Sequence, residues 1–472
     1  MIERERSSKN GYHVRAVLSA LVAIIVLLAG AGVAPADTVR RPSHTDVRAL
    51  ADPSPCPGQP RFICSTLTVP LDHRGGARGS LRLQVAAARN VTAPKGVLLF
   101  FGGGPGQAAV PLMSRLAARM PEVARAYRIV TMDQRGTGRT AIDCPALQAE
   151  VGSSDIAVPS TTAVAQCARI VGRYRHYYTT EQSLGDFDLL RRALGARQVV
   201  VDGASYGSLS AARYAVAYPD HVSRVVLDST MPHISTPDVP LYLAGLCAQA
   251  RVLRDACAGL PACSWDPASD VAWLVRHGYD DIALFDTTVA YEYTDPDYEA
   301  LIMALHRARE GVRKPLDELV EATRQRQAAN ARDYSAGLHA ATFCSDTRFP
   351  WGDSAVPPWR RGAALRRAVR DIPEERVWPY LPATAVGNGF VDTCRNWPVT
   401  RPSPAVRRSL PDVPVLIVSG DRDLSTPLEW ARWEARYAPR HQLVVIPGAD
   451  HSLQLFEPGT EGRRAVTDFL RR

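Results

Sequence analysis

The sequence predicts a doubly wound α/β fold with a mostly parallel sheet and a mainly helical cap inserted into it. Short apolar runs such as 96–101 and 198–202 are typical of strands buried on both faces of a parallel sheet. Helix-like amphipathic segments alternate with these runs, as expected for a doubly wound sheet. The alternation is lost over 231–410, which we interpret as the cap.

The expected elements follow in order along the chain. The first part of the core, 67–230, contains expected strands at 81–85, 96–101, 128–133, 198–202 and 225–228, and helices at 184–194 and 208–218. The cap contains a helical stretch over 298–327, which Pro315 could interrupt. The second part of the core, 411–472, contains expected strands at 415–418 and 443–446 and a closing helix at 462–470.

Size and charge limit the classes of protein to consider. A chain of 472 residues suits one large domain with an insertion, or two domains, and an apolar fraction of 46% makes wholesale disorder improbable. The net charge of +8 raises the question of nucleic-acid binding. The basic residues are scattered, however, with no long Lys/Arg run, so we expect no nucleic-acid partner.

The N-terminal 36 residues are typical of a signal peptide. Basic residues precede an apolar stretch at 16–33, and Ala-Pro-Ala at 34–36 offers a small-x-small cleavage motif. An uncleaved transmembrane anchor is the alternative, because the apolar stretch is near the lower length limit for a span. We expect a secreted, extracellular or cell-wall-associated protein with no other stable membrane partner. Residues 37–66 follow as an arm rich in proline and arginine.

Nine cysteines in an exported chain indicate disulfides. Their spacing lacks the paired C-x-x-C of zinc sites, and we expect no metal ion and no cofactor. The plausible pairs are Cys56 with Cys64, Cys144 with Cys167, and Cys344 with Cys394. Two of the remaining three could pair, which leaves one over: Cys247, Cys257 and Cys263.

A nucleophile motif follows one of the buried strands. The sequence GASYG at 203–207 lies between an expected strand and an expected helix, which is the context of the nucleophile elbow in the α/β-hydrolase fold. A chance Gly-x-Ser-x-Gly in a loop is the alternative, and the placement disfavours it. Ser205 is therefore the predicted nucleophile.

A serine hydroxyl needs a base and an orienting carboxylate before it can attack. In this fold these groups follow later strands in the order Ser, Asp, His. Asp423 and His451 each lie just past one of the two C-terminal strands. Asp421 competes with Asp423, either could cap a helix, and a lone histidine is often structural. Their order and position favour Ser205, Asp423 and His451 as a catalytic triad.

The glycine cluster GGGPG at 102–106 follows the first buried strand, where this fold places a donor for the oxyanion. We predict an oxyanion hole formed by the backbone amides of Gly103 and Tyr206. A phosphate-binding loop is the alternative, but the Gly-Lys-Ser/Thr ending is missing.

Several motifs together resemble one family. The segments GGGPGQ at 102–107, DQRGTG at 133–138 and GASYG at 203–207 resemble the proline iminopeptidase group of α/β-hydrolase serine peptidases. Within that group the chain is most similar to secreted actinobacterial tripeptidyl aminopeptidases, which share an early cysteine pair and a Gly-x-x-Asp-x-x-Thr-Pro motif, here at 420–427. The motif assigns the acid to Asp423. One departure is Gly102, where proline iminopeptidases usually have histidine.

The resemblance implies a secreted serine exopeptidase that removes short peptides, with tripeptides expected, from free N-termini through an acyl-enzyme. The ammonium group of such a substrate requires acceptors in the cap. The candidates, each more often an ordinary solvated or capping carboxylate, are Glu292, Asp295, Asp297, Asp346 and Asp392. Arg135 is interpreted as a structural buttress.

Two other functions stay open. A secreted carboxylesterase or lipase could use the same triad, because fold does not fix substrate. A non-catalytic binding module would keep the fold alone, and Ser205→Ala would then change nothing measurable.

Overall fold

The computed structural model describes residues 49–295 and 297–472. The predicted signal peptide and the beginning of the predicted arm lie outside these residues. None of the helices within the described ranges has both the length and the hydropathy that a membrane span requires.

A nine-stranded sheet forms the centre of the described chain, in the order β1-β2-β3-β5-β4-β6-β7-β8-β9. The first three pairings, β1–β2, β2–β3 and β3–β5, are antiparallel, and the other five are parallel. The strands are β1 (Ala51–Cys56), β2 (Gln59–Pro70), β3 (Ser80–Ala88), β4 (Val97–Phe101), β5 (Arg128–Met132), β6 (Val199–Ala204), β7 (Val222–Asp228), β8 (Val415–Gly420) and β9 (His441–Ile446).

The predicted arm is more regular than expected from Ala51 onward. Its last residues form β1 and most of β2, an antiparallel pair at the edge of the sheet. The sequence analysis did not predict these strands because the segment is rich in proline and polar residues. An edge strand tolerates proline and exposes its side chains, so it need not show an apolar pattern.

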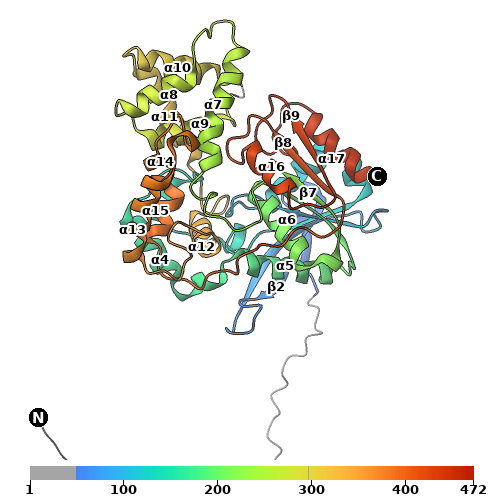
Figure 1. Cartoon of the computed structure of the whole chain (residues 1–472). Helices are drawn as coiled ribbons and strands as arrows, with labels where there is room; N and C mark the ends of the chain where they lie inside the picture. The colour runs from blue at the N-terminus through green and yellow to red at the C-terminus, as the bar shows by residue number, and fades with distance from the viewer. Residues whose placement is uncertain (1–48, 296) are drawn as a thin grey trace, which may run out of the picture. The chain divides into compact units, whose positions relative to one another are not determined.

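Helices cover both faces of the sheet, which makes the fold doubly wound as predicted (Figure 1). One face packs against α5 (Thr180–Ala193), α6 (Tyr206–Ala217) and α16 (Leu428–Ala435). The other face packs against α1 (Met113–Arg119), α2 (Pro121–Ala126) and α17 (Glu461–Arg471). Successive strand residues alternate between the two cores, so the central strands need apolar residues at every position.

A helical cap occupies the chain between β7 and β8 (Figure 1). The helical stretch over 298–327 is interrupted just before Pro315, a break that the sequence analysis allowed for, and Pro315 lies in the first turn of the second helix. The cap helices are α7 (Leu243–Ala258), α8 (Pro267–Arg276), α9 (Asp281–Tyr291), α10 (Glu299–Arg309), α11 (Lys314–Gln327), α12 (Ala336–Asp346), α13 (Pro358–Asp371), α14 (Pro382–Gly387) and α15 (Gly389–Asn396).

Two helices from an earlier part of the chain pack with the cap. Helix α3 (Pro145–Val151) contacts α12, and α4 (Thr161–Val171) contacts α12 and α15. Their buried side chains belong to the same apolar cluster as those of the cap helices. The cap is therefore built from two separate stretches of sequence, a feature that strand–helix alternation alone does not reveal.

Four disulfides stabilise the described chain. The three predicted pairs are confirmed: Cys56–Cys64, Cys144–Cys167 and Cys344–Cys394. The fourth pair joins Cys257 to Cys263, and Cys247 is left as an exposed free thiol. Each disulfide lowers the entropy of the unfolded chain and so favours the folded state.

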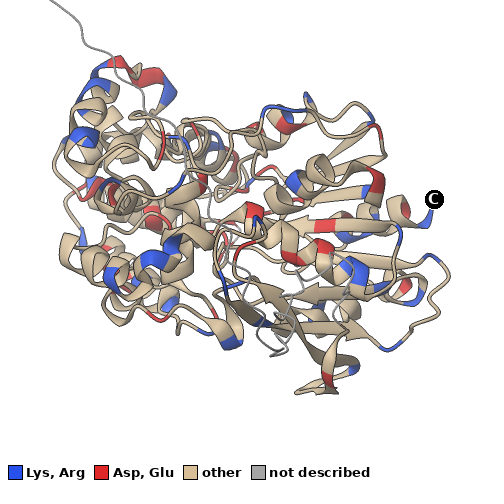
Figure 2. Cartoon of the chain, turned by 90° about the horizontal axis from the view of Figure 1, so that it is seen from below, with Lys and Arg blue, Asp and Glu red and all other residues tan. Residues whose placement is uncertain are grey.

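Basic and acidic residues are interspersed over core and cap helices alike (Figure 2). This arrangement agrees with the scattered charges of the sequence. Neither the core nor the cap carries charges of one sign alone.

Candidate active site

Ser205 lies at a sharp turn between β6 and α6. Its backbone has φ 60° and ψ −130°, a conformation that costs energy for a residue with a side chain. Gly203 and Gly207 permit the turn, because a Cβ on Gly203 would lie 2.1 Å from the carbonyl oxygen of Gly207. A Cβ on Gly207 would lie 2.0 Å from the carbonyl oxygen of Phe101. The geometry is that of a nucleophile elbow.

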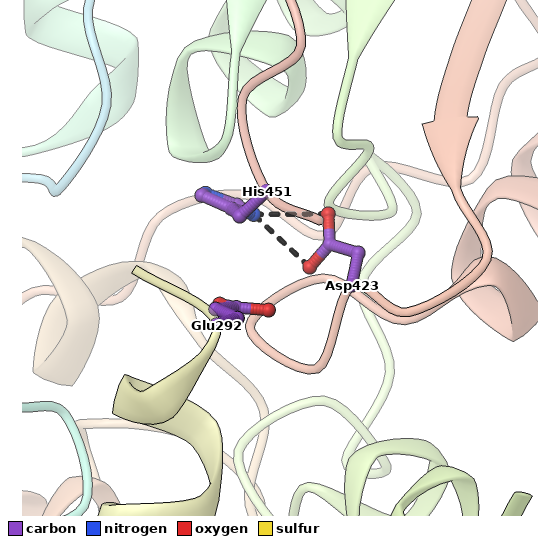
Figure 3. Close-up of side chains that lie close together, drawn as sticks. All are labelled: Glu292, Asp423 and His451. Carbon is purple, nitrogen blue, oxygen red and sulfur yellow. Dashed lines mark hydrogen bonds and ion pairs between the residues drawn. The ribbon is translucent and has the colours of Figure 1, made fainter. Parts of the chain in front are cut away.

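Asp423 and His451 meet at the carboxyl ends of β8 and β9 (Figure 3). The Nδ1 atom of His451 lies 3.0 Å from Oδ1 and 2.9 Å from Oδ2 of Asp423. Thr426 donates to the same carboxylate from its backbone N, at 2.7 Å, and from its hydroxyl, at 2.9 Å. Asp421, the competing carboxylate, instead accepts from the backbone N of Gly448 at 2.8 Å and is partly exposed.

The environment of His451 favours its charged form. Burial lowers its pKa, but the charge of Asp423 and its hydrogen bond raise it, with a net result of about 9. The carboxyl group of Asp228 adds to the increase, and that of Glu292 does so in its ionised form. An imidazole that takes the proton of a serine becomes an imidazolium ion, and this site stabilises that ion.

Ser205 and His451 line one cavity of about 420 Å³ between core and cap. Within the described part of the chain, no hydrogen bond joins the Ser205 hydroxyl to the imidazole ring. Such contacts often tighten only when substrate is bound. The contact between Asp423 and His451 is present, and the triad as a whole stays a prediction. Gly103 and Tyr206 line the same cavity.

The predicted oxyanion donors lie beside the elbow. A Cβ on Gly103 would be 3.3 Å from Cβ of Ser205, and Tyr206 opens the first turn of α6. Among the described residues, neither backbone N–H donates a hydrogen bond to a backbone acceptor in a turn, loop or helix cap. Both are therefore available to an oxyanion, and the N-terminus of α6 favours negative charge there.

Two buried carboxyl groups, one within β6 and one at the end of β7, hold the loop that carries the histidine. Asp228 accepts from the backbone N atoms of Leu453, at 3.1 Å, and Gln454, at 2.8 Å. Asp202 accepts from the side-chain amide of Gln454 at 2.8 Å. Burial raises the pKa of Asp202 to about 8 and that of Asp228 to about 6. Sequence reasoning missed both, although each directly follows an apolar run of three residues.

Arg135 is a buttress, as its sequence context indicated. Its guanidinium is fully buried and makes two hydrogen bonds with Asp186, at 2.7 and 2.8 Å. It also donates to the carbonyl groups of Pro70, Leu71 and Tyr177. Arg135 does not line the cavity, so it supports the fold beneath the site.

None of the five carboxylates proposed for ammonium binding lines the cavity. Asp346, for example, is buried elsewhere and accepts hydrogen bonds from Thr180 and Ser403. The cavity instead presents Asp155 and Asp286, which no motif in the sequence marks. Aromatic side chains also line the cavity, among them Tyr242, Phe343, Phe390 and Trp430.

One group of side chains in the described ranges has the types and spacing of a metal site. It consists of Glu292, Asp423 and His451, whose potential ligand atoms all lie within 4.8 Å of one another. These atoms already serve other partners, since His451 bonds to Asp423, and Glu292 is hydrogen-bonded to Leu424 and Ser425. We therefore assign no metal to the cluster.

Comparison with known proteins agrees with the fold. Residues 96–268 match the family model of the alpha/beta hydrolase fold, and residues 381–472 match that of TAP-like proteins. The chain is 26% identical over 425 residues to the tripeptidyl aminopeptidase of Streptomyces coelicolor, which covers 78% of this chain and 73% of the relative. It is 24% identical over 441 residues to the serine protease Hip1 of Mycobacterium tuberculosis, covering 83% and 82%.

A solved hydrolase from Pseudomonas aeruginosa aligns with a TM-score of 0.41 and 16% identity, covering 86% of this chain and 98% of that one. The fold, the elbow and the family models define the chain as an α/β hydrolase. Its C-terminal region, which carries Asp423 and His451, is of the TAP-like kind. The tripeptidyl aminopeptidases of Streptomyces are among its relatives.

Proposed function

We propose that this α/β hydrolase is a secreted serine peptidase that removes short peptides, chiefly tripeptides, from free N-termini. The names of its relatives, tripeptidyl aminopeptidase and serine protease, support a peptidase. The four disulfides of the described chain suit an oxidising, extracellular environment.

The chemistry follows from the proposed roles of the triad. His451 takes the hydroxyl proton of Ser205 as its Oγ attacks the scissile carbonyl, and Asp423 stabilises the resulting imidazolium ion. The amides of Gly103 and Tyr206 bind the developing oxyanion. The C–N bond then breaks, the leaving amine receives the proton from His451, and an acyl-enzyme remains. Water then attacks the acyl carbonyl while His451 takes its proton. The Ser205 oxygen leaves and receives that proton, which frees the peptide and restores the enzyme.

The observation that carries the choice of substrate is a pair of carboxylates in the cavity. Asp286, on the cap helix α9, accepts at Oδ1 from the Ser154 hydroxyl, at 2.7 Å, and from the Gln327 amide, at 2.9 Å. Among the described residues its Oδ2 has no hydrogen-bond partner. A cavity-facing carboxylate oxygen without a donor is suited to the ammonium group of a peptide N-terminus.

Asp155 is the second carboxylate. It accepts from the hydroxyl of Tyr242 at 2.8 Å, and its Oδ1 lies 3.3 Å from Nε2 of His339. Its charge contributes to raising the pKa of Asp286, whose main cause is burial, so the two carboxyl groups share one electrostatic environment. An ammonium ion bound beside both would relieve their repulsion.

An esterase or lipase remains the second candidate, because the aromatic side chains that line the cavity also suit an apolar acyl chain. A neutral ester gains nothing from two carboxylates beside it, and their desolvation would oppose its binding. The carboxylate pair therefore favours the aminopeptidase.

The test compares matched tripeptide p-nitroanilides with a free and an acetylated N-terminus, alongside a p-nitrophenyl ester. We expect kcat/KM for the free amine to exceed that for the acetylated substrate at least tenfold, with no turnover by Ser205→Ala. Equal rates for both peptides, or ester turnover without peptide turnover, would refute the proposal. Mass spectrometry of a digested longer peptide would show whether fragments of three residues accumulate.

A further inference from the structure

A carboxyl group from the cap contacts the loop that carries the catalytic acid. Glu292, directly after α9, is buried, with an exposed fraction of 4%. Its Oε2 lies 2.8 Å from the backbone N of Leu424, and its Oε1 lies 2.5 Å from the hydroxyl oxygen of Ser425. The two residues that follow Asp423 are thus both bonded to the end of a cap helix.

The same segment of the cap reaches the catalytic base. The ring of Tyr293 meets that of His451 edge to face, with centroids 5.7 Å apart. Figure 3 shows Glu292 arriving from the cap helix on one side, while Asp423 and His451 come from two core loops. Glu292 does not line the cavity, so it is not placed to touch substrate.

The negative charge of Asp423 determines whether Glu292 is protonated. The carboxyl oxygens of Glu292 and Asp423 lie within 4.8 Å of each other, and two buried carboxyl groups at that distance cannot both ionise without a large cost in free energy. Asp423 accepts from the imidazole and twice from Thr426, so the negative charge belongs on Asp423. Burial and then the charge of Asp423 raise the pKa of Glu292 to about 8. The titratable groups that face Glu292 are Asp423 and His451 from the core and Tyr293 and Tyr298 from the cap.

We propose that Glu292 is a positioning residue that, as an uncharged carboxylic acid, holds the Asp423 loop in place against His451. In this form Oε2 accepts from the Leu424 amide and the acid proton is donated to the Ser425 hydroxyl. The cap thereby fixes the acid–base pair of the core without adding a second negative charge. This inference rests on the proposed triad.

Three variants test it: Glu292→Gln, Glu292→Ala and, as a matched control on the exposed start of α10, Glu299→Gln. Glutamine reproduces the uncharged acid, since its carbonyl accepts where Oε2 does and its NH₂ donates to Ser425. The readout is the rate constant for labelling of Ser205 by a fluorophosphonate, measured from pH 5 to 9. This reaction needs the triad but no particular substrate.

We expect Glu292→Gln and Glu299→Gln to label within about twofold of the wild-type rate, and Glu292→Ala to label at least about tenfold more slowly. Below about pH 7, where Glu292 keeps its proton, the pH dependence of labelling, which reports protonation of His451, should coincide for wild type and Glu292→Gln. If Glu292→Ala fails to fold, Glu292→Asp, which cannot reach both partners, should show the same loss.

Three results would overturn the inference. They are a Glu292→Ala enzyme that labels at the wild-type rate, a Glu292→Gln enzyme as slow as the alanine variant, and an acid limb displaced downward by about one pH unit in Glu292→Gln. The last would show that Glu292 carries a negative charge beside the imidazole. A wild-type enzyme that is not labelled at all would instead refute the proposed triad itself.

Discussion

Replacing Asp286 by asparagine should separate recognition of the N-terminus from the chemistry at Ser205. Asparagine keeps the carbonyl oxygen that accepts from Ser154 and Gln327, so the cavity wall should survive. The substitution removes the negative charge and puts an NH₂ donor in place of Oδ2, the oxygen proposed to bind the substrate's ammonium group. The expected effect is therefore confined to substrates that carry an ammonium group.

The magnitude follows from the contact that is lost. Unit charges about 4 Å apart attract by about 4 kcal/mol at an effective dielectric constant of about 20, and desolvation of both groups offsets part of this. A charged hydrogen bond contributes about 2 kcal/mol net. We expect kcat/KM for a free-amine tripeptide anilide to fall about 30-fold, and that for its acetylated counterpart to stay within about twofold.

The pH dependence gives an independent check. Burial raises the pKa of Asp286 to about 6, so its carboxylate forms as the pH rises through that value. The substrate amine loses its proton near pH 8. The ratio of kcat/KM for free and acetylated substrates should therefore peak between about pH 6 and pH 8 in the wild type. Because both substrates depend equally on His451, its titration cancels from the ratio.

Asp371→Asn, at the exposed end of the cap helix α13, is the matched control and should leave both rates unchanged. The reasoning fails if Asp286→Asn lowers turnover of the free and acetylated substrates by the same factor. It also fails if the ratio of the two rates shows no dependence on pH.

Two further predictions concern stability. The folded protein keeps the proton of Asp202 up to about pH 8, whereas the unfolded chain loses it near 3.8, so Asp202 lowers stability as the pH rises through that range. Relative to wild type in urea unfolding, Asp202→Asn should gain at least about 1 kcal/mol between pH 5 and pH 8; a constant difference would contradict this. Arg135→Met, which removes the guanidinium from buried Asp186 and leaves it the His73 ring, at 2.7 Å, as its side-chain partner, should cost about 3–5 kcal/mol of unfolding free energy. Its folded fraction should still be labelled by a fluorophosphonate; loss of labelling would give Arg135 a direct part in the reaction.

The sheet and the positions of the triad could be predicted because each has a local signature. Continuous apolar runs mark the central strands, and Ser205, Asp423 and His451 each lie just past such a run. The carboxyl ends of parallel strands meet at one edge of a sheet, so order along the chain is enough to bring these residues together. Asp423 and His451 lie 2.9 Å apart, as that order leads one to expect, and the catalytic role of the three residues stays a prediction.

The substrate side of the cavity could not be predicted in the same way. Asp155 follows α3, far from the cap in sequence, and reaches the cavity because α3 and α4 pack with the cap helices. Glu292 was singled out as a carboxylate for substrate, but its role depends on packing against the Asp423 loop. Helix–helix packing leaves no short motif, so neither placement can be read from spacing.

The central claim is that Ser205, Asp423 and His451 act as one catalytic unit. The most direct test is intact and peptide mass spectrometry after reaction with a fluorophosphonate. We predict a single added phosphonyl group on the peptide containing Ser205, formed at a rate that falls at least about a thousandfold in His451→Ala. A label on another residue, or one that forms on Ser205 equally fast without the histidine, would contradict this account of the site.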